Sequence, residues 1–204
     1  MIRVVKTNQN KAIVVNGSPI AIRVVPSGYT ELAGITCNNN AYYNTGLYLE
    51  STDIIKFSCL ATATCYVLGA LNATDATDNF TMYHVSNGKA YVRYGNLANR
   101  VQDTNNVKYN IVVTPTGITG LDEQKTWSQQ TFTTSYPLYI GWSPNTTQAK
   151  LKGTLYGEIE VVGKAKYVPV ERDSDGAIGY YDVYSDTFFE NQGASAPTPI
   201  YVNS

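Results

Sequence analysis

Short stretches of β-branched and aromatic residues, separated by clusters of Gly, Asn, Asp and Pro, recur along this 204-residue chain. Sandwiches and barrels of short strands have this pattern, because turn residues must follow each strand. No apolar repeat at positions i, i+3, i+4 and i+7 is sustained, so the sequence does not indicate helices. The clearest turn is Asn87-Gly88, between the predicted strands 79–85 and 89–94, since Asn-Gly suits a tight hairpin. We therefore predict an all-β fold.

Composition and charge exclude several classes of partner. The chain has 15 Lys and Arg against 16 Asp and Glu, a formal net charge of −1, which gives no electrostatic footprint for nucleic acid. No apolar run approaches the roughly 20 residues that span a bilayer. The first six residues lack the apolar stretch of a signal peptide, so synthesis in a cytoplasm is expected. We predict neither a nucleic-acid partner nor a membrane partner.

The cysteines and the single histidine do not indicate a cofactor. Cys37, Cys59 and Cys65 are an odd number without a secretory signal, which argues against a disulfide framework. Cys59 and Cys65 flank an apolar segment, and we expect them to be buried as small hydrophobic residues. A zinc site needs more ligands than the sequence offers, because His84 is the only histidine. We expect His84, in mid-strand, to be a half-exposed strand residue rather than a catalytic base.

Residues 1–27 are predicted to form a separate β meander with strands at 2–5, 12–15 and 20–25, followed by a Pro26-Ser27-Gly28 linker. A meander of this size buries too little apolar surface to be stable alone. It should therefore pair with the main domain, with a twin chain or with another surface; the alternative is that it simply extends the main sandwich. The candidate attachment or oligomerisation residues are Ile2, Val4, Ile13, Val15, Ile20, Ile22 and Val24.

The segment 167–193 reads YVPVERDSDGAIGYYDVYSDTFFENQG: an extended stretch, an acidic turn, a Tyr-rich strand, a second turn and an aromatic strand. It resembles the closing signature of concanavalin A-like (laminin G-like) jelly-roll domains, which are common in virion proteins of tailed phages. The segments Gly28-Tyr29-Thr30-Glu31-Leu32 and Ala41-Tyr42-Tyr43-Asn44-Thr45-Gly46 are similar to the family's opening. The chain departs from that pattern at residues 37–40, where a Ser-Thr-Gly-Thr type of turn is usual.

The resemblance implies a concanavalin A-like jelly-roll sandwich over residues 28–204, preceded by the small N-terminal β meander. It also implies a function: a non-enzymatic virion structural protein of a tailed bacteriophage, either a head fibre or a capsid-decorating protein. Such a protein would be assembled in the host bacterial cytoplasm and located in the virion. Its N-terminal segment would contact other capsid or fibre proteins, and a small contact repeated by symmetry favours a dimer or trimer.

Carbohydrate binding is the alternative function, as an adhesin module for host or mucus glycans. Sugars stack on exposed aromatic faces, and the candidate contacts in or near loops are Tyr42, Tyr43, Trp127 and Trp142. Each of these residues also fits a core position. A glycoside hydrolase is less well supported, because Glu158 and Glu160 share one face of a strand but no third acid follows.

The acidic turn at residues 173–176 resembles part of a calcium loop. Calcium needs six or more oxygen ligands, and this loop supplies about three. We therefore expect a turn in which Arg172 pairs with the neighbouring acids.

Overall fold

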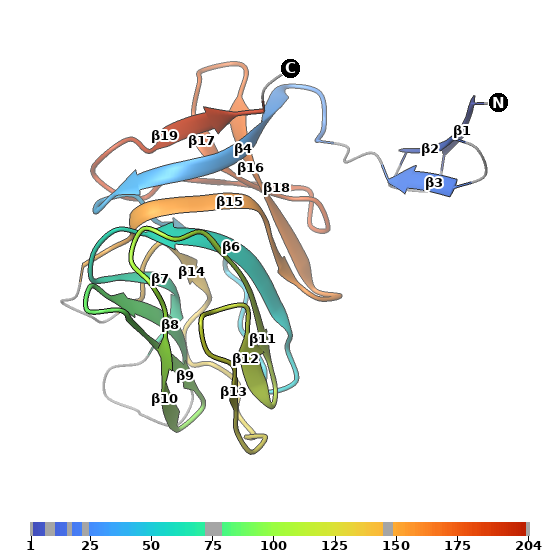
Figure 1. Cartoon of the computed structure of the whole chain (residues 1–204). Helices are drawn as coiled ribbons and strands as arrows, with labels where there is room; N and C mark the ends of the chain where they lie inside the picture. Colours follow the sequence, from blue (N-terminus) through green and yellow to red (C-terminus); the bar gives the residue numbers. More distant parts are fainter. Residues whose placement is uncertain are drawn as a thin grey trace.

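The computed structural model describes residues 2–6, 11–15, 18–21, 25–71, 79–144 and 149–202. Within these ranges the chain forms nineteen strands and no helix, and every pairing is antiparallel (Figure 1). The predicted all-β class is confirmed, with two large antiparallel sheets consistent with a β-sandwich. In the same part of the chain, no helix is long and apolar enough to cross a membrane.

The first three strands form a small sheet in the order β1-β2-β3. They are β1 (Ile2–Lys6), β2 (Lys11–Val15) and β3 (Ser18–Ala21). Among the strands that the structure describes, these three pair only with one another. The candidate attachment residues Ile2, Val4, Ile13, Val15 and Ile20 lie on them, whereas Ile22 and Val24 fall outside the described residues.

The second sheet has six strands in the order β10-β9-β8-β7-β14-β5. They are β5 (Tyr43–Asn44), β7 (Cys65–Ala70), β8 (Phe80–Val85), β9 (Lys89–Tyr94), β10 (Leu97–Gln102) and β14 (Tyr139–Ile140). The predicted Asn87-Gly88 turn joins β8 to β9, and Gly88 has a φ of 80°, which explains the glycine there. Strands β7 to β10 are thus a meander of sequential neighbours.

The third sheet has ten strands, nine of them in the order β13-β12-β11-β6-β15-β4-β16-β17-β18, with β19 paired to β4. They are β4 (Tyr29–Asn38), β6 (Ile55–Ala61), β11 (Tyr109–Thr114), β12 (Gly117–Thr119), β13 (Lys125–Thr126), β15 (Lys152–Val161), β16 (Ala165–Arg172), β17 (Ile178–Asp182), β18 (Thr187–Glu190) and β19 (Thr198–Tyr201). The extended, Tyr-rich and aromatic parts of segment 167–193 are β16, β17 and β18.

The core lies between the two large sheets. Ile35 and Leu155 from one sheet and Phe80 and Val92 from the other belong to a single cluster of fully buried side chains. The three cysteines join this cluster as free thiols, so the predicted burial of Cys59 and Cys65 is confirmed. Burial raises the pKa of Cys65 to about 11, because a thiolate would lose its hydration in the core. The thiol of Cys65 is therefore neutral at physiological pH.

A smaller apolar cluster lies on the opposite face of β16 and β17. Tyr167 faces the main core, and the alternation of the strand points Val168 and Val170 the other way. Tyr181, Val25 and the Tyr29 ring complete this cluster, together with Phe188. The chain is therefore already packed against the sandwich at Val25, just before the predicted Pro26-Ser27-Gly28 linker.

Candidate functional site

Three aromatic rings and one lysine gather at the β5 edge of the six-stranded sheet. The ring centroids of Tyr42 and Trp142 are 4.9 Å apart, and Tyr139 lies 6.1 Å from Tyr42 and 5.5 Å from Trp142. Lys150 Nζ lies 5.2 Å from the Tyr42 ring centroid and 5.5 Å from that of Trp142. All four side chains are half-buried. We call Tyr42, Tyr139, Trp142 and Lys150 the aromatic cluster.

The fold assembles the aromatic cluster from three separate segments. Tyr42 directly precedes β5, whose Asn44 is the partner of Tyr139 on β14. Gly141, with a φ of 79°, ends β14 and redirects the chain at Trp142. The Leu151 amide donates to the Gly141 carbonyl at 2.7 Å, and this bond brings the preceding Lys150 beside the rings. The cluster therefore depends on long-range pairing as well as on residue type.

The structure brings together two of the four predicted glycan contacts and places the other two elsewhere. Tyr42 and Trp142 belong to the aromatic cluster. Tyr43 is fully buried in the core, where its ring meets Tyr180 edge-to-face at 4.9 Å. Trp127 packs against the core beside Tyr94, and its Nε1 donates to the Pro115 carbonyl at 3.1 Å. The cluster partners Tyr139 and Lys150 were not predicted from the sequence.

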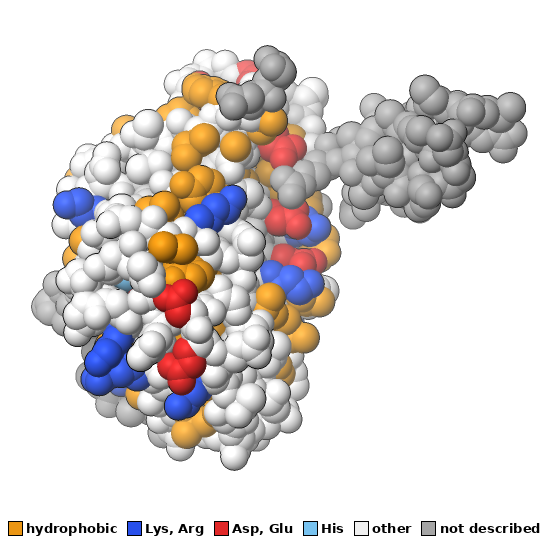
Figure 2. All heavy atoms as spheres, viewed as in Figure 1, with side chains coloured by type: hydrophobic (Ala, Val, Ile, Leu, Met, Phe, Trp, Pro, Cys, Tyr) orange, Lys and Arg blue, Asp and Glu red, His pale blue; other side chains and the backbone are white. Residues whose placement is uncertain are grey.

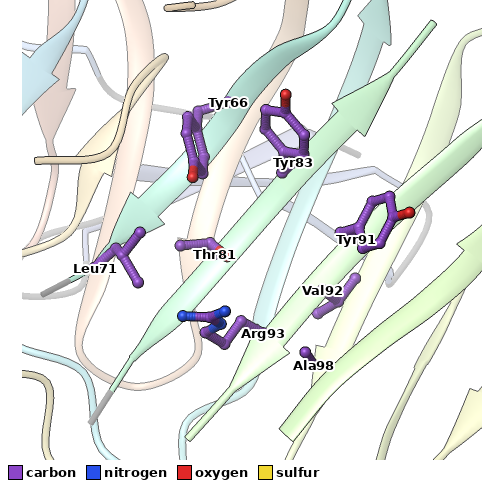
Figure 3. A pocket seen from close by; sticks show the side chains of 8 residues that line it. All are labelled: Tyr66, Leu71, Thr81, Tyr83, Tyr91, Val92, Arg93 and Ala98. Carbon is purple, nitrogen blue, oxygen red and sulfur yellow. The ribbon is translucent and has the colours of Figure 1, made fainter. Parts of the chain in front are cut away.

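A hollow of about 220 Å³ lies on the outer face of the meander β7 to β10. Its lining includes three tyrosines in neighbouring strands, with ring centroids 4.7 Å apart between Tyr66 and Tyr83 and 6.4 Å apart between Tyr83 and Tyr91. We call these three residues the tyrosine row. Figure 3 shows the rings of the row and Arg93 reaching from β9 toward Thr81 on β8. In the sequence, core-facing and outward-facing positions alternate along residues 79–85 and 89–94. This alternation was the signal that could have placed Tyr83 and Tyr91 on one face of the sheet.

His84 is buried, with 3% of its side chain exposed, so the expectation of a half-exposed residue was wrong. It alternates with Phe80 and Met82 and therefore faces the core. Its Nδ1 pairs with the Asp103 carboxylate, and its Nε2 lies 2.8 Å from Asn105 Oδ1. The amide nitrogen of Asn105 donates to the Ser86 carbonyl, which fixes its oxygen toward the ring. Both ring nitrogens are thus engaged by neighbouring side chains inside the protein.

The carboxylates of Glu158 and Glu160 are both ion-paired on the outer face of the larger sheet. Glu160 Oε2 lies 3.1 Å from Lys56 Nζ, and Glu158 Oε1 lies 3.5 Å from Lys166 Nζ. Both glutamates line a shallow hollow with Lys56 and Asn110. An acid–base pair for hydrolysis needs carboxylates with different environments, whereas these two have similar ones.

The acidic turn contains the ion pair predicted for Arg172. Its guanidinium donates to both carboxylate oxygens of Asp175, at 2.9 and 2.6 Å, and pairs with Glu190 as well. The Arg172 cation lowers the pKa of Asp175 to about 2. Asp173 accepts a 2.9 Å hydrogen bond from Thr30 Oγ1. Within the described ranges, no group of three or more His, Cys, Asp or Glu residues is placed to hold a metal ion.

Acidic and basic side chains are interspersed over the face of the molecule that Figure 2 presents, without a large field of one sign. This agrees with the near-balanced composition. The chemistry suited to binding is instead concentrated in the aromatic cluster and around the tyrosine row. Comparison of the chain with protein-family models and with curated proteins finds no match.

Proposed function

We propose that the chain is a non-enzymatic structural protein of a tailed-phage virion, a head fibre or a capsid-decorating protein. The observation that carries the proposal is the arrangement of segment 167–193, whose expected strands pair consecutively as β16, β17 and β18. Arg172 holds the turn between the first two strands by pairing with Asp175 and with Glu190 on the third. The engagement of His84 and of both candidate glutamates supports a role without catalysis.

The connections between the sheets support a jelly roll of the concanavalin A-like type. Strands β6 and β11 are neighbours in the larger sheet, although the meander β7 to β10 that separates them in sequence belongs to the other sheet. Strand β14 then returns to pair with β7 and β5 before the chain crosses back to β15. Repeated crossing between two layers is characteristic of jelly rolls.

The small N-terminal sheet is the proposed attachment and oligomerisation device. Its three strands pair with one another among the described residues, and a unit of fewer than about 40 residues usually needs a partner to bury enough apolar surface. A partner surface, on the capsid, on a fibre or on a twin chain, would supply the missing burial. The sandwich would then face outward from the particle, where it is able to contact host-cell glycans.

Deleting residues 1–24, which keeps Val25 against the sandwich, is expected to abolish incorporation into particles and to convert a dimer or trimer into a monomer, while the sandwich stays folded. Mass spectrometry of purified particles measures incorporation, and light scattering measures the oligomer. The point variant Trp142→Ala is the control, since it alters the sandwich surface and should be incorporated normally. Unchanged incorporation and oligomer size after the deletion would contradict the proposal.

Carbohydrate binding is a second candidate function, and the aromatic cluster is the observation that favours it. Rings of Tyr42, Tyr139 and Trp142 within 6.1 Å of one another offer an apolar platform, and Lys150 adds a hydrogen-bond donor beside it. Half-buried aromatic groups with a few convergent polar groups are typical of ligand sites. The two functions are compatible, because a protein displayed on the virion can also bind glycans.

Trp142→Ala is expected to weaken binding to a neutral glycan about tenfold, because the largest stacking surface of the aromatic cluster is lost. A glycan array on the full chain identifies the ligand, and calorimetry then compares the variants. Tyr184→Ala removes a ring that is 46% exposed and lies outside the cluster, so it serves as the matched control. Equal affinity of the Trp142→Ala and Tyr184→Ala variants would contradict a glycan site at the cluster.

A further inference from the structure

The outer face of the meander is locally cationic in a chain of almost balanced charge. Strands β7, β8, β9 and β10 contain Lys89, Arg93 and Arg100 but no Asp or Glu. The register places Arg93 beside Thr81 and Ala98, whereas Arg100 lies opposite Tyr91. Paired residues share a face of the sheet, so both guanidinium groups lie on the same side as the hollow.

The shape of this face comes from the tyrosine row and two short side chains. Tyr66, Tyr83 and Tyr91 form one side, and Thr81 and Ala98 form a low floor beside them. The Arg100 guanidinium lies 4.9 Å above the centre of the Tyr91 ring. Tyr66 and Arg93 both line the hollow, and the Arg93 cation opposes the rise in the pKa of Tyr66 that burial causes. Three tyrosine rings and the Arg93 guanidinium therefore line the same hollow, and the Arg100 guanidinium lies beside it over the Tyr91 ring.

Neither Arg93 nor Arg100 forms an ion pair with any residue in the described part of the chain. Arg172, by comparison, is bound by two carboxylates. A guanidinium group fits a carboxylate through two parallel N–H donors, and this geometry gives specificity as well as affinity. Among the described residues, the hollow thus combines a stacking surface with guanidinium donors that no carboxylate occupies.

We propose that the outer face of β7 to β10 binds a carbohydrate that carries a carboxylate, a uronate or a sialate. The sugar ring packs on the tyrosine row, its carboxylate binds Arg93, and Arg100 contributes a second positive charge. This inference rests on the second candidate function, carbohydrate binding, and adds the ligand class, but it uses residues outside the aromatic cluster.

The aromatic cluster lies on the same side of the sheet as the hollow. Tyr139 is paired with Gly69, and Gly69 with Thr81, so the three positions follow one another across β14, β7 and β8. With strands about 4.8 Å apart, Tyr139 and Arg93 are separated by about 14 Å. Ser143 lies against Gly69 between the two places. An oligosaccharide long enough to cover this distance would contact both.

Calorimetry of the full chain with two matched pairs of sugars tests the ligand class. One pair is oligogalacturonate and its neutral methyl ester; the other is sialyllactose and lactose. We expect at least about tenfold tighter binding to the acidic member of one pair, and the pair that responds identifies uronate or sialate as the source. Equal affinity for the acidic and neutral members of both pairs would overturn the proposal.

Arg93→Gln is expected to remove about tenfold of the affinity for the acidic sugar, and Arg93→Lys, which keeps the charge but not the fork, to remove less. Lys152→Gln makes the same change of charge at an exposed position of β15 in the other sheet and should leave affinity unchanged. Thermal melting checks that each variant is folded, and Arg100→Gln, at an exposed position, carries the test if Arg93→Gln fails to fold. If Arg93→Gln and Lys152→Gln reduced the affinity for the acidic sugar equally, the proposal would be overturned. Equal losses would indicate general electrostatic attraction rather than binding at a specific site.

The outcomes separate this inference from the candidate function on which it rests. Suppose that Trp142→Ala abolishes binding of a glycan, whereas Arg93→Gln and the carboxylate of the sugar have no effect on its affinity. This result would overturn the acidic-sugar site and would support glycan binding at the aromatic cluster. If no sugar binds, either on the array or in the two matched pairs, both the acidic-sugar site and the carbohydrate-binding function are overturned.

Discussion

Replacing His84 with alanine is expected to lower the free energy of unfolding by about 3–5 kcal/mol, because the change leaves the buried acidic side chain of Asp103 without its partner. The side chains of His84 and Asp103 are 3% and 4% exposed. The second carboxylate oxygen of Asp103, Oδ1, has no hydrogen-bond partner in the described structure. Loss of the imidazole would therefore isolate the whole carboxylate from both water and protein donors. Urea unfolding followed by tryptophan fluorescence measures the loss.

A double-mutant cycle distinguishes this pair from two independent packing contributions. Asp103→Ala should cost about as much as His84→Ala, whereas the double variant should cost clearly less than the sum, since neither member of the pair is left buried without the other. Asn105→Ala is the graded control, because it removes the acceptor at Nε2 and the donor to the Ser86 carbonyl but keeps the His84–Asp103 pair, and it should cost about 1–2 kcal/mol. Additivity of the two single substitutions within about 0.5 kcal/mol would contradict a coupled buried pair.

Tyr180→Ala should destabilise the fold by about 3–5 kcal/mol, whereas Tyr180→Phe should be neutral or slightly stabilising. The Tyr180 side chain is fully buried and packs edge-to-face on Tyr43. Its hydroxyl has no hydrogen-bond partner among the described residues, so removing the oxygen relieves an unmet donor while the ring stays. Burial also raises the pKa of Tyr180 well above its usual value, which keeps the phenol neutral.

The adjacent tyrosine offers the matched control for this comparison. Tyr181 donates its hydroxyl to the Asp186 carboxylate, so Tyr181→Phe should cost about 1 kcal/mol. The same urea titrations serve for all three variants. If Tyr180→Phe proved as costly as Tyr181→Phe, the Tyr180 hydroxyl would have to be satisfied in solution, and the argument from an unmet donor would fail.

Most long strands could be predicted because their residues alternate or their turns are explicit. The strands predicted at 79–85 and 89–94 agree with β8 and β9 to within a residue. Strands β10, β12, β13 and β19 were not predicted. Strands β12 and β13 are three and two residues long, and β10 has polar residues at its exposed positions. Strand β19 contains Pro199, which argues against a strand except at an edge or bulge.

The candidate sites show where single-sequence reasoning ends. Tyr42 and Trp142 were named as aromatic residues near loops, but their contact depends on the pairing of β5 with β14 and on the turn at Gly141. The inward direction of His84 follows from its alternation with Phe80 and Met82, which the sequence contains. Its partner Asp103 follows β10, and no local pattern links the two residues. The sequence therefore identified the types of residue that form the sites, whereas the residues that lie next to them in space could be identified only from the fold.

The packing of Val25 and Tyr29 on Val168, Val170 and Tyr181 has a mechanical consequence. Tension transmitted along the chain would first meet the sandwich at Val25 and would then load Tyr29, the first residue of β4. That strand is bonded to β15, β16 and β19, so a pull along its axis loads several ladders in shear at once. A body tethered at this point would resist detachment by flow better than one held through an edge hairpin, whose bonds open one after another.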